Sequence, residues 1–232
     1  MKKMILLSSF LAFSVFAGDR RISVNGECTV EVQPDRGSVI LVAENLSPNA
    51  KAAIQQATVL HEKLRKELKA SKVKDLELSK TEYNVQEITT WENNKSVSKG
   101  FQCRIGLKAV TPDIAALGEI IAIAGNVGIR STHSLVTYLS DAKMLDEKKK
   151  CLEVAAKNAR EKAEYLLKSL GEKLGDVLMI QEHGANSVQP VPMMLESPLM
   201  ARAMNDKVSA PTIEASRQTI HHEVDVTFAI EH

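Results

Sequence analysis

The sequence predicts an α+β protein in which antiparallel strands, arranged as hairpins, pack against helices. Two stretches, residues 21–33 and 97–109, alternate apolar and polar side chains at the period of a half-buried strand. Two others, residues 50–68 and 145–170, repeat apolar side chains at spacings of three and four, as amphipathic helices do. Because strands follow strands in pairs between the helices, the order favours antiparallel sheets over a parallel one.

The first elements are a pair of strands and a helix. Residues 21–33 form the first strand, Pro34 to Gly37 are turn residues, and residues 39–43 form a second strand that is apolar on both faces. These two strands are predicted to pair as an opening hairpin. Ser47 and Pro48 then predict a helix start, with Ser47 as the N-cap.

The middle of the chain repeats this order. Residues 76–109 predict two strands joined by a turn at residues 91–95, where Trp91 is either an exposed binding anchor or packed on its own hairpin. Thr111 and Pro112 begin a second helix that is predicted to end at Gly125. Since both helices begin with a hydroxyl residue and a proline after a strand, the sequence suggests two related α/β modules.

The last part holds the longest helix and two further strands. The helix spans residues 141–170 and ends at Gly171, after a short strand at residues 133–139. A strand at residues 177–181 follows, and a final strand alternates strictly from residue 220 to residue 230. Between these two strands lies a long loop, residues 183–216.

The N-terminal residues predict a secretory signal peptide, residues 1–17. Lys2 and Lys3 precede an apolar stretch, and small side chains at Val15 and Ala17 place the cleavage site after Ala17. A retained amphipathic anchor is the alternative. The mature chain, residues 18–232, holds no apolar segment long enough to span a bilayer, so no transmembrane segment is expected there. The leader looks bacterial, and the predicted location is the periplasm.

Charge and composition exclude some classes of function. The chain has 30 basic and 29 acidic residues, and cleavage of the leader removes two lysines. A nearly neutral protein has no electrostatic reason to bind nucleic acid. Aromatic residues make up only 4% of the chain, so stacking platforms for bases or sugars are scarce and the core must be aliphatic.

Three cysteines leave the redox state open. Cys28 and Cys103 both fall on apolar strand faces, so they could form one disulfide in an oxidising compartment. Buried free thiols that act as small hydrophobes are the preferred interpretation. No pair has the C-x-x-C spacing of a redox motif.

The loop at residues 183–216 is rich in proline and methionine. Loops of this length are typically functional, disordered or folded against a partner. The methionines favour three hypotheses: an adaptable contact surface, a mobile loop, or a thioether site for Cu(I). They are Met193, Met194, Met200 and Met204.

No familiar catalytic motif is present in its required context, and we expect no enzymatic activity and no cofactor. The most metal-like group is His221, Glu223 and Asp225, which alternation places on one strand face. Successive members of that face lie about 7 Å apart, too far for one ion to bind all three from a straight strand. Solvated strand residues are the preferred interpretation, and no metal site is predicted.

Several short segments together resemble the SIMPL-domain family of bacterial envelope proteins, and the resemblance covers essentially the whole mature chain. The matching segments are Ile22 to Gly26, Gln33 to Asp35, Gly100 with Phe101, the helix through Ala155, Ala159 and Ala163, Leu170 to Val177, Pro211 to Glu214, and the strand end Val226 to Phe228.

The resemblance implies a secreted, non-enzymatic α+β protein that forms homo-oligomers, contacts envelope partners and contributes to envelope integrity or stress tolerance. The family has no established catalytic residues, so the resemblance assigns none to this chain. The alternative hypothesis from the residues is a periplasmic carrier of a ligand or of Cu(I).

Overall fold

The computed structural model describes residues 20–183, 191–192 and 210–231, and it confirms the predicted α+β class. The chain divides into two compact units. In the described residues, unit 1 holds 20–27, 153–183 and 223–231, and unit 2 holds 28–152, 191–192 and 210–222. The strands are β1 (Arg21–Val32), β2 (Arg36–Ser47), β3 (Glu77–Glu92), β4 (Lys95–Thr111), β5 (Ser131–Tyr138), β6 (Lys173–His183), β7 (Val191–Pro192) and β8 (Gln218–Glu231), and the α-helices are α1 (Ala50–Ala70), α2 (Leu117–Val127) and α3 (Asp141–Ser169).

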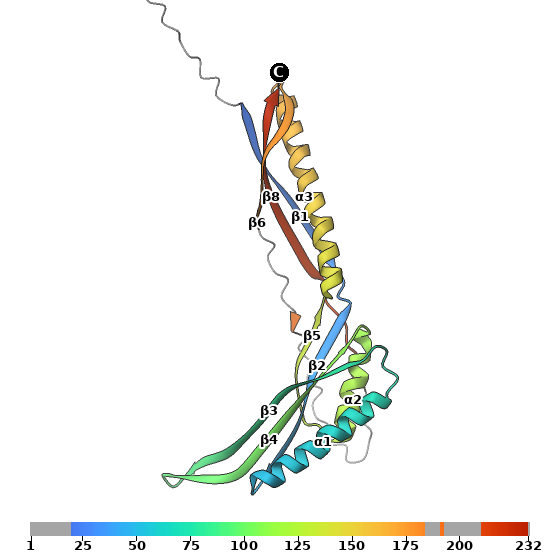
Figure 1. The fold of residues 1–232 in the computed structure, drawn as a ribbon, viewed down its shortest axis with the longest axis vertical. Helices are drawn as coiled ribbons and strands as arrows, with labels where there is room; N and C mark the ends of the chain where they lie inside the picture. The colour runs from blue at the N-terminus through green and yellow to red at the C-terminus, as the bar shows by residue number, and fades with distance from the viewer. Residues whose placement is uncertain (1–19, 184–190, 193–209, 232) are drawn as a thin grey trace, which may run out of the picture. The chain divides into compact units, whose positions relative to one another are not determined.

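Unit 2 contains a five-stranded sheet in the order β3-β4-β2-β5-β7, with every neighbouring pair antiparallel. Helices α1 and α2 lie on one face of it (Figure 1). The core between them joins Leu64 of α1 and Leu117 of α2 to Val39 and Leu41 of β2. Because alternate residues of a strand share a face, both helices cover the face that carries Val39 and Leu41.

The central position of β2 explains why its sequence is apolar on both faces. It pairs with β4 on one side, with Leu41 opposite Leu107, and with β5 on the other. Both Leu41 and its neighbour Val42, which points to the opposite face, are fully buried. A strand buried on both faces needs no polar alternation.

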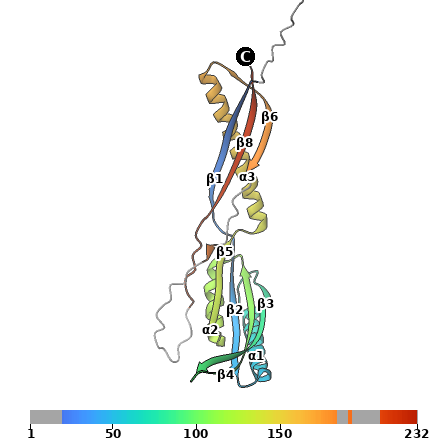
Figure 2. The same cartoon turned by 90° about the vertical axis from the view of Figure 1, so that its left-hand side faces the viewer.

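Unit 1 contains a three-stranded sheet in the order β1-β8-β6, with α3 along one face (Figure 2). The helix contacts the sheet through a line of small side chains, and Ala155, Ala159 and Ala163 are fully buried. Gly26 of β1 lies directly beneath them. A Cβ on Gly26 would lie 2.1 Å from the carbonyl oxygen of Ala155, so only glycine permits this close approach.

The pairing of the first two strands differs from the prediction. β1 belongs to the three-stranded sheet and β2 to the five-stranded sheet, so the predicted opening hairpin is wrong. Side chains along β1 instead meet β8: Ser23 Oγ lies 2.8 Å from Thr227 Oγ1, and Thr29 Oγ1 lies 3.0 Å from His221 Nδ1. Alternation identifies a half-buried strand but contains no information about which strand pairs with it.

Two predicted helix ends also need correction. Both α1 and α2 belong to unit 2. The N-cap of α1 is Asn49, whose side chain accepts a hydrogen bond from the Ala52 amide, whereas Ser47 ends β2. Helix α2 continues through Gly125 and ends at Gly128, whose φ of 106° is the left-handed conformation that glycine adopts readily.

The disulfide differs from the possible Cys28–Cys103 pair, and of the three cysteines only Cys103 is the buried free thiol that the sequence favoured. Cys28 of β1 is bonded to Cys151 of α3, and Cys103 is a free, fully buried thiol. The positions of the three cysteines within unit 2 explain which two are bonded. Cys103 lies on the face of β4 that packs against Ala53 and Ala57 of α1, whereas the Cα atoms of Cys28 and Cys151 are 5.5 Å apart.

Candidate interaction surface

The most exposed apolar segment of the described structure is the edge strand β6. Its residues Val177, Leu178, Met179 and Ile180 are consecutive, and their side chains are between 45% and 66% exposed. β6 lies at the end of its sheet, and no described strand pairs with its outer side. A row of unpaired backbone groups beside exposed apolar side chains is a template for association with another chain.

The exposure is concentrated in unit 1. Eight of the fourteen large apolar side chains that are exposed in the described residues belong to this smaller unit. They include Tyr165, Leu166 and Leu170 in addition to the four of β6. Single exposed apolar residues are ordinary, whereas the four of β6 are consecutive and form a candidate site of interaction.

The width of the sheet explains why α3 leaves β6 uncovered. The helix is centred over β1: Asn158 Oδ1 accepts a hydrogen bond from the Glu27 amide, and Lys162 Nζ donates to the Asn25 carbonyl. β6 is two strands away, a separation of about 10 Å. A helix extends only about 5–6 Å from its axis, so one helix cannot cover both edges.

The backbone of β6 is irregular. Its pairing with β8 shifts register between Leu174 and Val177 and again between Val177 and Met179. Val177 lies opposite Phe228 and Met179 opposite Thr227. Such bulges twist a strand and are frequent at sheet edges. Directly opposite residues share a face, so the apolar segment presents side chains to both faces of the sheet.

Polar side chains fill the face of this sheet away from α3. The Asn25 amide nitrogen donates to Glu223 Oε1 at 2.5 Å and to Asp225 Oδ1 at 3.2 Å. His183 Nε2, at the end of β6, lies 2.6 Å from Asp225 Oδ2. The hydrogen bond with Asp225 raises the pKa of His183, and the bonds from His183 and Asn25 lower the pKa of Asp225.

Each residue of the predicted metal-like group has a hydrogen-bond partner on β1. Glu223 and Asp225 share the Asn25 amide in unit 1, whereas His221 contacts Thr29 in unit 2. In residues 20–183, 191–192 and 210–231, no three His, Cys, Asp or Glu side chains gather closely enough to hold a metal ion. The helices in the same ranges are too short or too polar to cross a bilayer.

The methionines of the long loop lie outside the described residues, as does the signal peptide with its cleavage site at Ala17. Within the loop, Val191 and Pro192 form β7, which pairs with β5. Trp91 is 78% exposed, so it does not pack on its own hairpin. The β6 surface was missed at the sequence level, where residues 177–181 predict only a short strand; the available signal was a run of apolar residues without alternation.

The comparisons with known proteins give one result. The family model described as "SIMPL: Protein of unknown function (DUF541)" matches residues 22–228. A search of curated proteins found no match.

Proposed function

The chain belongs to the SIMPL family, and we propose that it is a secreted, non-enzymatic protein of the bacterial periplasm that assembles with copies of itself through β6. Its contribution would be to envelope integrity or stress tolerance, through this assembly and through contacts with envelope partners. The observation that carries the proposal is the exposed apolar run from Val177 to Ile180 on an unpaired strand edge.

Two features support the location. The first seventeen residues have the charge, apolar stretch and small residues of a secretory leader. The disulfide between Cys28 and Cys151 is of the kind that forms and persists in oxidising compartments, including the bacterial periplasm.

The position of the apolar run within β6 supports a second copy as the partner. The exposed residues Val177 to Ile180 lie near the middle of Lys173–His183. When two copies of one strand pair antiparallel, the start of each lies beside the end of the other. The same two-fold arrangement places the apolar residues of each copy together in the middle, as a self-complementary interface requires.

A pair of lysine substitutions tests this interface. We expect Leu178→Lys with Ile180→Lys to reduce the solution mass of the mature chain, because charged side chains on an edge strand oppose pairing. Both native side chains are more than half exposed, so the protomer should keep its fold. Light scattering on a sizing column measures the mass, and circular dichroism with thermal melting checks the fold.

Leu145→Lys is the matched control. Leu145 is 55% exposed and Leu178 is 54% exposed. Leu145, however, lies on α3 in unit 2. The proposal predicts that this variant has the wild-type mass. An unchanged mass in the folded double variant would remove β6 from the assembly.

A further inference from the structure

The sheet of unit 1 ends in β1 on one side and in β6 on the other. An edge strand carries backbone N–H and C=O groups that point out of the sheet and can pair with a strand of another chain. A sheet that pairs at both edges can grow without limit, whereas a sheet that pairs with its own copy at one edge stops after two copies. The state of the β1 edge therefore determines whether assembly through β6 comes to an end.

The outward-pointing backbone groups of β1 belong to its odd-numbered residues. The Arg20 carbonyl accepts a hydrogen bond from the Ile230 amide at 3.0 Å, so the groups of Arg20 point toward β8. In an antiparallel strand this direction alternates from one residue to the next, so residues 21, 23, 25 and 27 point their groups away from β8. These four residues form the part of the β1 edge that lies in unit 1.

Two side chains of α3 occupy this edge. The Glu27 amide donates to Asn158 Oδ1 at 3.2 Å, and Lys162 Nζ donates to the Asn25 carbonyl at 3.1 Å. Lys162 Nζ also lies 3.5 Å from Glu27 Oε1, an ion pair that holds the ammonium beside the strand. Since Asn158 and Lys162 are four residues apart, they lie on the same flank of α3. These two residues are here called the β1 cap.

The β1 cap competes directly with a partner strand. A paired strand would run about 4.8 Å from β1. The side-chain atoms that bond Asn25 and Glu27 at 3.1 Å and 3.2 Å lie within that space. Only residues 21 to 23 then remain for pairing, a stretch no longer than the shortest strands. A lysine at a sheet edge is itself a device against association. The same helix leaves the exposed run of β6 uncovered.

We infer that Asn158 and Lys162 close the β1 edge against other chains and thereby confine assembly to β6. Without the β1 cap, copies would add at β1 as well as at β6, and the assembly would grow beyond a pair. The size of the assembly rests on the proposed pairing at β6, whereas the closure of the β1 edge does not.

Two variants of the β1 cap test this inference by solution mass. We expect Asn158→Ala with Lys162→Ala to give about twice the wild-type mass or more, rising with protein concentration, because pairs joined at β6 add further copies at β1. Alanine is the strongest helix former, so α3 should stay intact. Lys162→Met is a milder variant that keeps an alkyl stem and removes the ammonium, and it should change the mass in the same direction. Light scattering on a sizing column measures the mass, and circular dichroism checks the fold.

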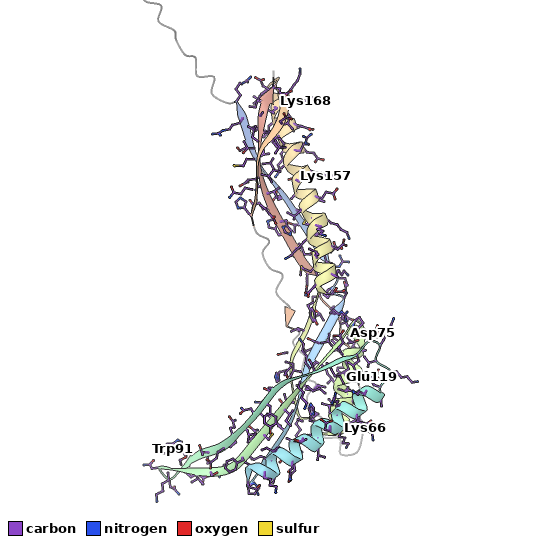
Figure 3. All side chains as sticks on the ribbon, viewed as in Figure 1. Lys66, Asp75, Trp91, Glu119, Lys157 and Lys168 are labelled. Carbon is purple, nitrogen blue, oxygen red and sulfur yellow. A yellow bond between two sulfur atoms is a disulfide. The ribbon has the colours of Figure 1, made fainter. Side chains whose placement is uncertain are left out.

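Glu153→Ala with Lys157→Ala is the matched control. These two side chains form an ion pair with each other at 2.6 Å on the same helix in unit 1. Figure 3 shows Lys157 on the side of α3 away from the sheet. This variant should keep the wild-type mass. Folded cap variants that have the wild-type mass at every concentration would overturn the inference.

A combined variant separates the β1 cap from the proposed function. With Leu178→Lys and Ile180→Lys added to the two alanines, β6 is blocked and the larger assembly should fall to no more than two protomers. Growth of the cap variant from a wild type that is a single protomer would support the closure of β1 and contradict assembly through β6. Loss of mass in the β6 double variant, together with cap variants that do not grow, would support β6 and remove the β1 cap.

Discussion

At the scale of single residues, two positions join α3 to β1: Gly26 in unit 1 and Cys28 in unit 2. Both lie on the same face of the strand, since they are two residues apart. Gly26 allows the helix backbone to approach, and Cys28 fixes its partner Cys151 covalently. The alternating sequence predicted this face to be buried, but a glycine and a cysteine in a strand do not show what covers them.

Loss of the disulfide should destabilise the protein substantially. We expect Cys151→Ser to lower the free energy of unfolding by about 2–5 kcal/mol, measured by chemical denaturation without reductant. The same chain has one free thiol, and burial raises the pKa of Cys103.

Counting thiols in the wild type provides the companion test. Alkylation should modify no cysteine in the native oxidised protein and one in the unfolded oxidised protein. Three reactive thiols after unfolding without reductant would show that the disulfide is absent.

The contact of Gly26 with α3 predicts a steric effect. We expect Gly26→Val to cost about 1–3 kcal/mol or more, because its Cβ would overlap the Ala155 carbonyl and the nearest atoms are backbone. Gly171→Asn is the control, since Gly171 has a positive φ that asparagine tolerates and nothing lies within 4 Å of an added Cβ. Equal melting temperatures for the two variants would argue against the close packing of α3 on β1.

At the scale of elements, the contrast between β6 and β8 shows how far the sequence can be interpreted. β8 is covered, and its alternation predicted a buried face that Val224, Val226 and Phe228 confirm. β6 has an apolar run that the sequence alone cannot distinguish from a buried strand. Its exposure depends on the position of α3 two strands away, and this is a property of the packed unit.

The same limit applies to the long-range pairs. The predicted turn at residues 91–95 is confirmed because two adjacent asparagines determine it locally. The pairing of β1 with β8 and the bond from Cys28 to Cys151 join residues more than 100 positions apart. Local periodicity predicts elements, and the choice among apolar partners follows from the fit of the assembled layers.

The contact between β6 and β8 predicts a pH dependence. The pKa of His183 is raised by Asp225, so its contribution to stability is present below the ordinary histidine pKa of about 6.5 and is lost as the pH rises through the folded value. The pKa of Asp225 is lowered, so its contribution is present above about 3.9 and is lost as the pH falls through its folded value. The pair therefore holds the end of β6 best at mildly acidic pH.

An NMR titration of the His183 ring measures this effect. We expect a midpoint above that of an unperturbed histidine, and a return toward the ordinary value in Asp225→Asn. A midpoint at or below about 6.5 in the wild type would show that the two side chains do not interact in solution.

At the scale of the whole molecule, the proposed function depends on exposed surfaces of the described structure and not on its pockets. The described structure places apolar side chains on an unpaired edge in unit 1 and an exposed tryptophan at a hairpin tip in unit 2. The β6 edge is the surface that carries the proposed assembly, and the predicted leader and the disulfide support the proposed location in the cell envelope.

The most direct test of self-assembly is the solution mass of the mature wild-type chain, residues 18–232, by light scattering on a sizing column over a range of concentrations. Our account predicts a discrete species whose mass is a whole multiple of the protomer and which persists on dilution to micromolar concentrations. A single protomer mass at every concentration would contradict it.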